Sequence, residues 1–167
     1  MRPFLIFGPI ALLLATAPAS AMTDDDFLRF AIQGDVSEAM LGRLAGQMCD
    51  TAALRSAGKT IEGDHDKARM EAEKLADLRG IKSPTLPAPD AAALAAKLKV
   101  LSGAAFARAF AAHMVKDHEQ AIAAYKAEAG SGKGPVARYA QMSLPMLEKH
   151  LRVAENMEKT GGTGSAK

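Results

Sequence analysis

The sequence contains no tryptophan and a single cysteine, Cys49. One cysteine cannot form an internal disulfide, so we expect the Cys49 thiol to be packed as a small apolar side chain. Aromatic residues account for only 5% of the chain, and no long stretch alternates between apolar and polar residues as a half-buried strand would. Because alanine, leucine and methionine are abundant instead, the composition predicts an all-α protein.

A surplus of charge of one sign is also absent. The chain has 21 lysines and arginines against 19 aspartates and glutamates, and the two signs are interspersed. A nucleic-acid or anionic-membrane partner would call for a basic patch, so we predict neither. There is also no serine elbow of the Gly-x-Ser-x-Gly kind and no plausible Cys–His pair that would indicate nucleophilic catalysis. The sequence therefore favours a binding protein over an enzyme and indicates no reaction.

Long apolar runs are missing except at the start of the chain. Phe4–Ala15 is apolar, follows Arg2 and precedes Ala19-Ser20-Ala21. This order is typical of a secretory signal peptide with a small-residue cleavage site. The run is short for a bilayer span. We therefore predict that residues 1–21 are a signal peptide, that the protein is periplasmic or secreted, and that no stable membrane span remains after cleavage.

Four later segments of roughly 25 residues have apolar positions at steps of three and four, which places those positions on one face of a helix. The first begins near Thr23 or Asp24, either of which is a suitable N-cap, and its apolar face includes Glu38. Gly34-Asp35 is an alternative start for this helix. The second begins near Asp50-Thr51, includes His65 in its face, and ends at Leu78-Arg79-Gly80.

A linker separates the second and third segments. Residues 81–89 contain three prolines, and Asp90 is placed to cap a short alanine-rich helix that ends near Leu101. The linker and short helix either turn tightly or cross the length of the molecule. The third long helix, Ala104–Ala129, has His118 in its face, and the fourth starts at Pro135 and includes His150. The sequence predicts a four-helix bundle over residues 22–159, followed by a disordered tail over residues 160–167.

Each long helix thus has one polar residue near the middle of its apolar face: Glu38, His65, His118 and His150. In an up-and-down bundle, these four residues lie within roughly two turns of one level. Buried carboxylates and imidazoles are costly unless they pair, bind a metal ion or become neutral. The pattern therefore predicts a polar layer, with two interpretations.

The first interpretation is a metal site in the bundle core. Glu38, His65, His118 and His150 would be its ligands, and mixed carboxylate and imidazole ligands suit iron, manganese or zinc. Glu62 and Asp117 are additional candidates, because Glu62 and His65 have Glu-x-x-His spacing and Asp117 adjoins His118. Leu147 stands where a second Glu-x-x-His pair would have its glutamate, so one metal ion fits better than a di-iron centre. His113 is expected at the surface.

The second interpretation is a structural network. Glu38 would accept hydrogen bonds from His65 and from His118 or His150, which would fix the register of the bundle. The protein would then be a non-catalytic helical interaction or stress protein. The sequence determines neither a protein partner nor a homo-oligomer.

Four segments together resemble a known family: residues 27–45 (FLRFAIQGDVSEAMLGRLA), Asp64-His65, residues 102–122 (SGAAFARAFAAHMVKDHEQAI) and residues 144–151 (LPMLEKHL). They are similar to the exported bacterial family called domain of unknown function 4142, whose members are often labelled outer-membrane proteins. The resemblance implies a ferritin-like four-helix bundle with a long connection between the second and third helices. It implies recurring polar positions at Glu38, His65, His118 and His150. It implies no established activity.

Overall fold

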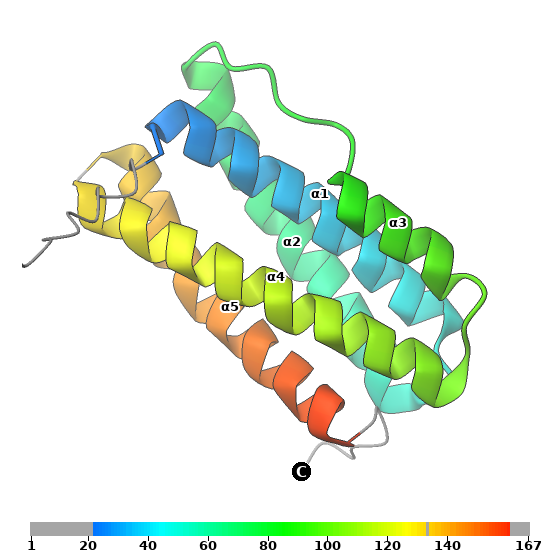
Figure 1. Ribbon diagram of the computed structural model, residues 1–167. Helices are drawn as coiled ribbons and strands as arrows, with labels where there is room; N and C mark the ends of the chain where they lie inside the picture. The colour runs from blue at the N-terminus through cyan, green and yellow to red at the C-terminus, as the bar shows by residue number, and fades with distance from the viewer. Residues whose placement is uncertain (1–21, 133, 161–167) are drawn as a thin grey trace, which may run out of the picture.

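The computed structural model describes residues 22–132 and 134–160, and within these ranges the chain forms five helices and no strand (Figure 1). The helices are α1 (Asp24–Met48), α2 (Ala52–Leu78), α3 (Pro89–Leu98), α4 (Gly103–Ser131) and α5 (Pro135–Thr160). The prediction of an all-α, ferritin-like four-helix bundle with a linker and short helix between the second and third long helices is confirmed.

The ends of the helices follow local capping chemistry. Thr23 caps α1 by accepting a hydrogen bond from the Asp26 amide, and Thr51 caps α2 in the same way. α1 runs unbroken through Gly34, so the alternative start there is wrong. Helix α3 begins at Pro89 rather than after Asp90, because a proline at the first position has the required backbone angle and needs no amide partner.

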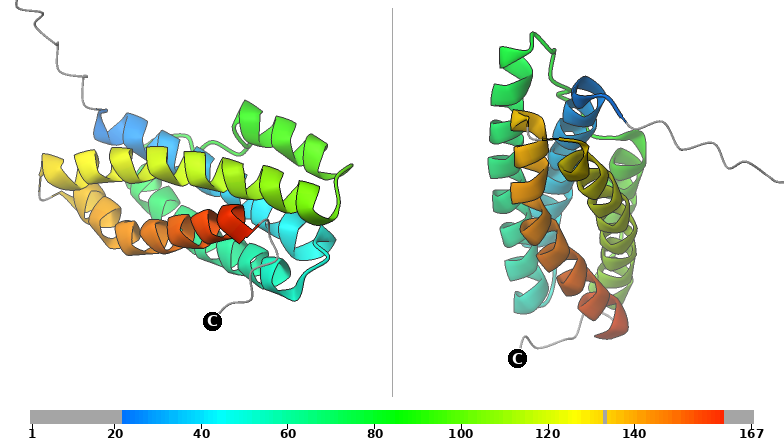
Figure 2. Two further views of the ribbon diagram at one scale, coloured as in Figure 1. Left: turned by 60° about the horizontal axis from the view of Figure 1, so that its bottom comes forward. Right: turned by 90° about the vertical axis from the view of Figure 1, so that its left-hand side faces the viewer.

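The connection between α2 and α4 crosses the whole length of the bundle. Helices α1 and α2 run antiparallel, as do α4 and α5, while the linker and α3 return along the molecule before α4 begins (Figures 1 and 2). Helix α3 packs against α1 and α4. Because the linker and α3 span the bundle once from end to end, α2 and α4 run in the same direction. The crossover also brings the middle of each long helix to a common level.

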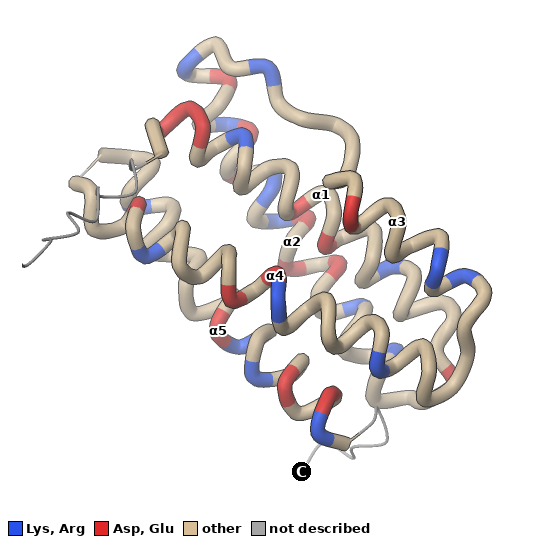
Figure 3. The backbone as a smooth tube through the Cα atoms, in the orientation of Figure 1, with Lys and Arg blue, Asp and Glu red and all other residues tan. Residues whose placement is uncertain are grey.

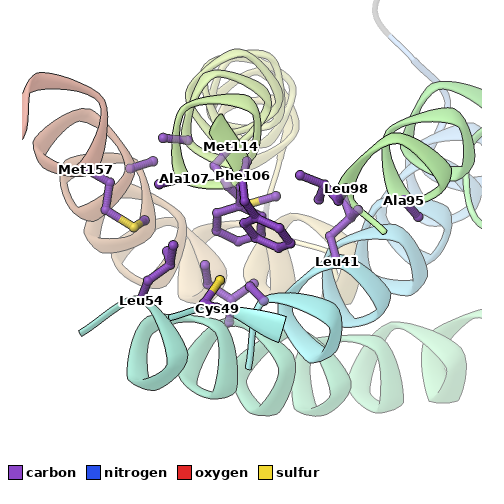
Figure 4. Close-up of a cluster of buried hydrophobic side chains, with 14 of the residues drawn as sticks. Leu41, Cys49, Leu54, Ala95, Leu98, Phe106, Ala107, Met114 and Met157 are labelled. Carbon is purple, nitrogen blue, oxygen red and sulfur yellow. The ribbon is translucent and has the colours of Figure 1, made fainter. Parts of the chain in front are cut away.

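Two apolar clusters fill the bundle, one at each end. The first contains Leu41, Leu54, Phe106 and Met157, and Figure 4 shows their side chains converging from α1, α2, α4 and α5. The second is built from the opposite halves of the same four helices and includes Phe27, Ala72, Ile122, Tyr125, Tyr139 and Leu147. Each long helix therefore passes from one apolar cluster to the other, and Glu38, His65, His118 and His150 lie in between.

Helices α1 and α2 approach closely because glycines face each other. A Cβ atom on Gly58 would lie 2.6 Å from the Gly42 carbonyl oxygen and 2.6 Å from the Gly46 amide nitrogen. A Cβ atom on Gly42 would lie 2.7 Å from the backbone of α2. Since real Cβ contacts are longer, glycine is required here for backbone-to-backbone packing. This contact sets the position of α2 relative to α1, and hence the positions of the polar residues further along both helices.

Several predictions concern other parts of the chain. The predicted signal peptide, residues 1–21, lies outside the described residues, as do residues 161–167 of the predicted tail. Thr160 belongs to α5, so the helix extends one residue into that tail. Cys49 is buried and free, as expected. None of the helices described is long and apolar enough to cross a membrane. Basic and acidic residues are interspersed along the helices (Figure 3).

Candidate metal centre

Three histidine rings from three helices meet at the centre of the bundle. His65 of α2, His118 of α4 and His150 of α5 are 2%, 1% and 2% exposed. One nitrogen from each ring lies within 4.8 Å of the other two. The ring centroids are 5.2 to 5.6 Å apart. We call these three residues the histidine cluster.

The outer nitrogen of each ring has a hydrogen-bond acceptor. His65 Nδ1 lies 2.8 Å from Asp35 Oδ1, and His118 Nδ1 lies 2.9 Å from the Met114 carbonyl oxygen. His150 Nε2 lies 3.1 Å from Asp64 Oδ2. A neutral imidazole carries one proton, and these acceptors fix that proton on the outer nitrogen. The remaining nitrogens, His65 Nε2, His118 Nε2 and His150 Nδ1, then have free lone pairs, and we call them the inner nitrogens. Metal-binding histidines in proteins are commonly oriented by such acceptors.

The inner nitrogens have no proton to share with one another. His65 Nε2 and His150 Nδ1 are 3.3 Å apart, and His118 Nε2 has no hydrogen-bond partner among the described residues. Two lone pairs facing each other at this distance repel unless a proton or a metal ion lies between them. Nitrogen ligands about 2.0–2.1 Å from a tetrahedral zinc ion are about 3.3–3.4 Å apart. The observed spacing therefore fits two nitrogens on one metal ion.

Burial keeps the three rings neutral at physiological pH. It lowers the pKa of His65 to about 4, and burial together with the neighbouring His65 and His150 rings lowers the pKa of His118 to about 3. It also lowers the pKa of His150 to about 4. Metal binding requires the unprotonated imidazole. Near pH 7, a metal ion therefore does not have to displace protons from these nitrogens.

Glu38, the fourth predicted ligand, lies in a different group. Its carboxylate oxygen, a nitrogen of His113 and an oxygen of Asp117 all lie within 4.8 Å of one another. We call Glu38, His113 and Asp117 the carboxylate cluster. The structure thus brings three of the four predicted residues together and places the fourth with Asp117, one of the additional candidates. His113, expected at the surface, is half-buried and belongs to this second cluster.

The other additional candidate, Glu62, belongs to neither cluster. Its carboxylate accepts a hydrogen bond from Arg43 Nε at 2.6 Å, between α1 and α2 at the edge of the bundle. The carboxylate of this segment that contacts the histidine cluster is Asp64, and it does so at the outer nitrogen of His150 rather than as a metal ligand. Glu62 and Asp64 point in different directions because each step along a helix rotates the side chain by about 100°. Glu62 therefore faces α1 rather than the centre of the bundle.

Asp35 is a buried site residue that the sequence interpretation missed. It is 3% exposed, lies beside His65 and accepts a hydrogen bond from the Tyr139 hydroxyl at 3.4 Å. Tyr125 lies next in this network, with its hydroxyl 3.3 Å from that of Tyr139. Burial raises the pKa of Asp35, while the Tyr139 hydrogen bond acts in the opposite direction. The sequence contained a signal for Asp35, because a residue three positions before Glu38 lies on nearly the same helix face.

Two cavities extend from the polar layer toward opposite sides of the bundle. One, of about 210 Å³, lies among α1, α3 and α4, and Asp35, His65 and Asp117 form part of its wall. The other, of about 300 Å³, lies between α2 and α5 and reaches His150. Both clusters therefore adjoin space through which a small ion could enter.

These features define a class: a helical bundle whose core contains a layer of buried histidines and carboxylates between two apolar ends. Residues 11–157 match the family described as domain of unknown function (DUF4142), and the chain belongs to that family. No curated protein matches the chain.

A solved structure with a similar fold is the crystal structure of a DUF305 fragment from Deinococcus radiodurans. It is 17% identical in sequence, with a TM-score of 0.73, and the match covers 84% of this chain and 98% of that one. At this level of identity, the similarity establishes the shared helical fold and nothing about activity.

Proposed function

We propose that this protein binds one divalent transition metal ion through His65, His118 and His150. The observation that carries the proposal is the arrangement of the inner nitrogens, which face one another as lone pairs while every outer nitrogen has an acceptor. Three imidazoles suit zinc or iron(II) better than manganese, which prefers oxygen ligands. Three protein ligands leave a coordination position open for water or an exchanging ligand.

The surrounding residues support this function by holding the rings in place. Asp35 and Asp64 lie at the outer nitrogens of His65 and His150, where each carboxylate fixes the orientation of a ring and increases its basicity. The Met114 carbonyl does the same for His118 without adding a charge. Two carboxylates next to the rings offset the charge of a divalent ion, so its burial costs less.

We place this function outside the cytoplasm, on the basis of the predicted signal peptide. The protein would then take part in metal handling or in protection from metal-dependent oxidative damage in the periplasm or the medium. Sequencing the amino terminus of the mature protein tests this location, and the expected first residue is Met22.

The competing function is a structural network with no metal. The series of contacts from Asp35 through His65 and His150 to Asp64 supports that alternative, because a proton between His65 Nε2 and His150 Nδ1 would make it a hydrogen-bonded chain that joins α1, α2 and α5. His118 distinguishes the two. Among the described residues, its hydrogen bond is to a carbonyl of its own helix, so it contributes little to a network between helices.

The decisive experiment compares His118→Leu with the wild type, both purified without a histidine tag. Elemental analysis and zinc titration by calorimetry should show one zinc or iron per wild-type chain and an affinity at least about 100-fold lower in the variant. Thermal unfolding without metal should change little. Glu119→Ala, an exposed neighbour on α4, is the control and should bind zinc as the wild type does.

A His65→Ala, His118→Ala double variant separates the alternatives further. If the rings bind metal, the double variant should contain none. If they form only a network, the double variant should unfold more easily while its metal content remains equal to that of the wild type. Wild-type protein that remains metal-free after loading with zinc, iron(II) and manganese would contradict the proposal.

A further inference from the structure

The carboxylate cluster joins α1 to α4 beside the histidine cluster. His113 and Asp117 are four residues apart on α4, which places both side chains on one face of the helix, opposite Glu38 of α1. His113 and Asp117 are half-buried, whereas Glu38 is only 2% exposed. The cluster therefore extends from the interior of the bundle toward solvent.

Glu38 is the unusual member of this group. Both of its carboxylate oxygens are buried without a hydrogen-bond donor among the described residues, because the side chain that faces them is a second carboxyl group, Asp117. His113 Nε2 is also buried and lacks such a partner. A buried carboxylate without partners is costly, and native proteins seldom keep one without a reason. The side chain is held in this position by the helix, so the missing interaction points to a ligand.

The surroundings of Glu38 favour a cation as that ligand. The side chains that raise the pKa of Glu38 are all acidic: Asp117, Asp35 and Asp90. Asp117, Asp35 and Asp90 also line the cavity of about 210 Å³ among α1, α3 and α4. A recess lined by carboxylates and enclosed by apolar side chains concentrates cations. The route to this cluster is thus suited to a positively charged ion.

We propose that Glu38, Asp117 and His113 form a second cation site, which takes a divalent ion that prefers oxygen ligands, with manganese as the representative. Two carboxylates and one imidazole are a donor set that suits manganese or iron(II), in contrast to the three imidazoles of the first site. This site goes beyond the proposed function, because its three ligands are separate from those of the histidine cluster. The bundle would then hold two ions of different ligand preference.

The test is a manganese titration in two conditions, with free Mn²⁺ measured by electron paramagnetic resonance. Wild-type protein preloaded with one equivalent of zinc, which fills the histidine cluster, should bind one further Mn²⁺ per chain. Glu38→Gln keeps the shape of the side chain and removes its charge, and it should weaken Mn²⁺ binding at least tenfold. Asp117→Asn should do the same, which guards against a folding defect in one variant. Circular dichroism should show the wild-type helix content in both.

Two controls separate this site from the first. Glu119→Gln, which removes an exposed carboxylate on α4, should bind Mn²⁺ as the wild type does. Zinc affinity should be unchanged within about threefold in Glu38→Gln. The same titration without zinc tests the second site even if the histidine cluster binds no metal.

Three outcomes would overturn the proposal. The first is wild-type protein that binds no Mn²⁺ at millimolar concentration in either condition. The second is Mn²⁺ binding that remains unchanged in both Glu38→Gln and Asp117→Asn, which would mean that Glu38 holds a proton instead of a metal ion. The third is Mn²⁺ binding that is lost only in His150→Ala, which would place the ion in the histidine cluster.

Discussion

Every ring of the histidine cluster has an acceptor at its outer nitrogen, whereas Glu38 of the carboxylate cluster faces the Asp117 carboxyl group and has no donor at either oxygen among the described residues. Both clusters occupy the same level of the bundle and share α4. In the first, the surrounding residues orient neutral groups, and only the inner lone pairs are left without a partner. In the second, a buried carboxyl group is itself left without a donor, and burial raises its pKa.

The difference shows that burial has opposite effects on the two clusters. A buried neutral imidazole is inexpensive and ready to bind a metal ion, because desolvation disfavours its protonated form. A buried carboxylate is unstable as an anion, so it either takes up a proton or binds a cation. The histidine cluster is therefore preorganised, whereas the carboxylate cluster depends on an ion to be stable in its charged form.

The largest expected effect is stabilisation by zinc. At a free zinc concentration 1,000 times the Kd, binding to the native state adds about 4 kcal/mol to the free energy of unfolding. Wild type and Glu38→Gln should show this gain in denaturant titrations, and a chelator should reverse it. His118→Leu should not. A loss of the gain in Glu38→Gln would mean that the two clusters form a single site.

The second prediction concerns the residues that orient the rings. Asp35→Asn removes the charge at the outer nitrogen of His65, and it should lower zinc affinity about 10- to 100-fold, as removal of such partners does elsewhere. Manganese affinity should fall much less. Isothermal titration with each ion measures both values. Equal losses for the two ions would show that Asp35 serves both clusters.

The third prediction uses the close contact between α1 and α2. Gly58→Ala forces these backbones apart and should cost about 1–3 kcal/mol in the free energy of unfolding. Because the shift separates His65 from Asp35, zinc affinity should fall more than manganese affinity. Gly63→Ala is the matched control on the same helix, since a Cβ atom there has nothing within 4 Å. That variant should be stabilised by about 0.5–1 kcal/mol. Equal stability of the two variants would contradict the importance of the contact.

The smallest effect is a pH dependence of opposite sign for the two clusters in metal-free protein. The folded-state pKa values of His65, His118 and His150 lie below the unfolded value of about 6.5, so the stability they contribute is present above about pH 6.5 and is lost as the pH falls toward 4. Burial raises the pKa of Glu38, and Asp117 raises it further, so the contribution of Glu38 is favourable below about pH 4.3 and is lost as the pH rises.

Glu38→Gln isolates the contribution of the carboxylate cluster. Removing a buried charge without a partner should stabilise the metal-free protein by about 1 kcal/mol at neutral pH. The gain should shrink toward pH 4, where the wild-type side chain is protonated as well. Urea unfolding between pH 4 and 8, in the presence of a chelator, measures it. A gain that is constant with pH would show that Glu38 is not charged in the native state at neutral pH.

The sequence predicted the fold well because the signals for it are local. Thr23 and Thr51 cap helices through contacts three residues away, and Gly80, with a positive φ of 68°, ends α2 as expected. The polar interruptions at Glu38, His65, His118 and His150 follow helical periodicity, which depends only on residue spacing. All four are buried.

The grouping of those residues could not be predicted in the same way. Periodicity placed His118 and Asp117 on the inner side of α4, but it did not show that His118 contacts α2 and α5 while Asp117 faces Glu38. Asp35 and His113 were missed because both lie away from the centre of the predicted apolar face. Whether the two clusters bind metal ions remains a prediction for the titrations above.

The amino-acid sequence by itself determined the number of long helices, their ends and the level at which each has a polar residue. These properties follow from hydrogen bonds and periodicity within one helix. Tertiary structure alone decided that the linker and α3 cross the full length of the bundle and that the polar residues divide into two clusters. The rotation and separation of neighbouring helices depend on side-chain packing, such as the backbone contact at Gly42 and Gly58. Rotating one helix about its axis by about 100°, the angle between consecutive residues, would give its histidine ring a different partner.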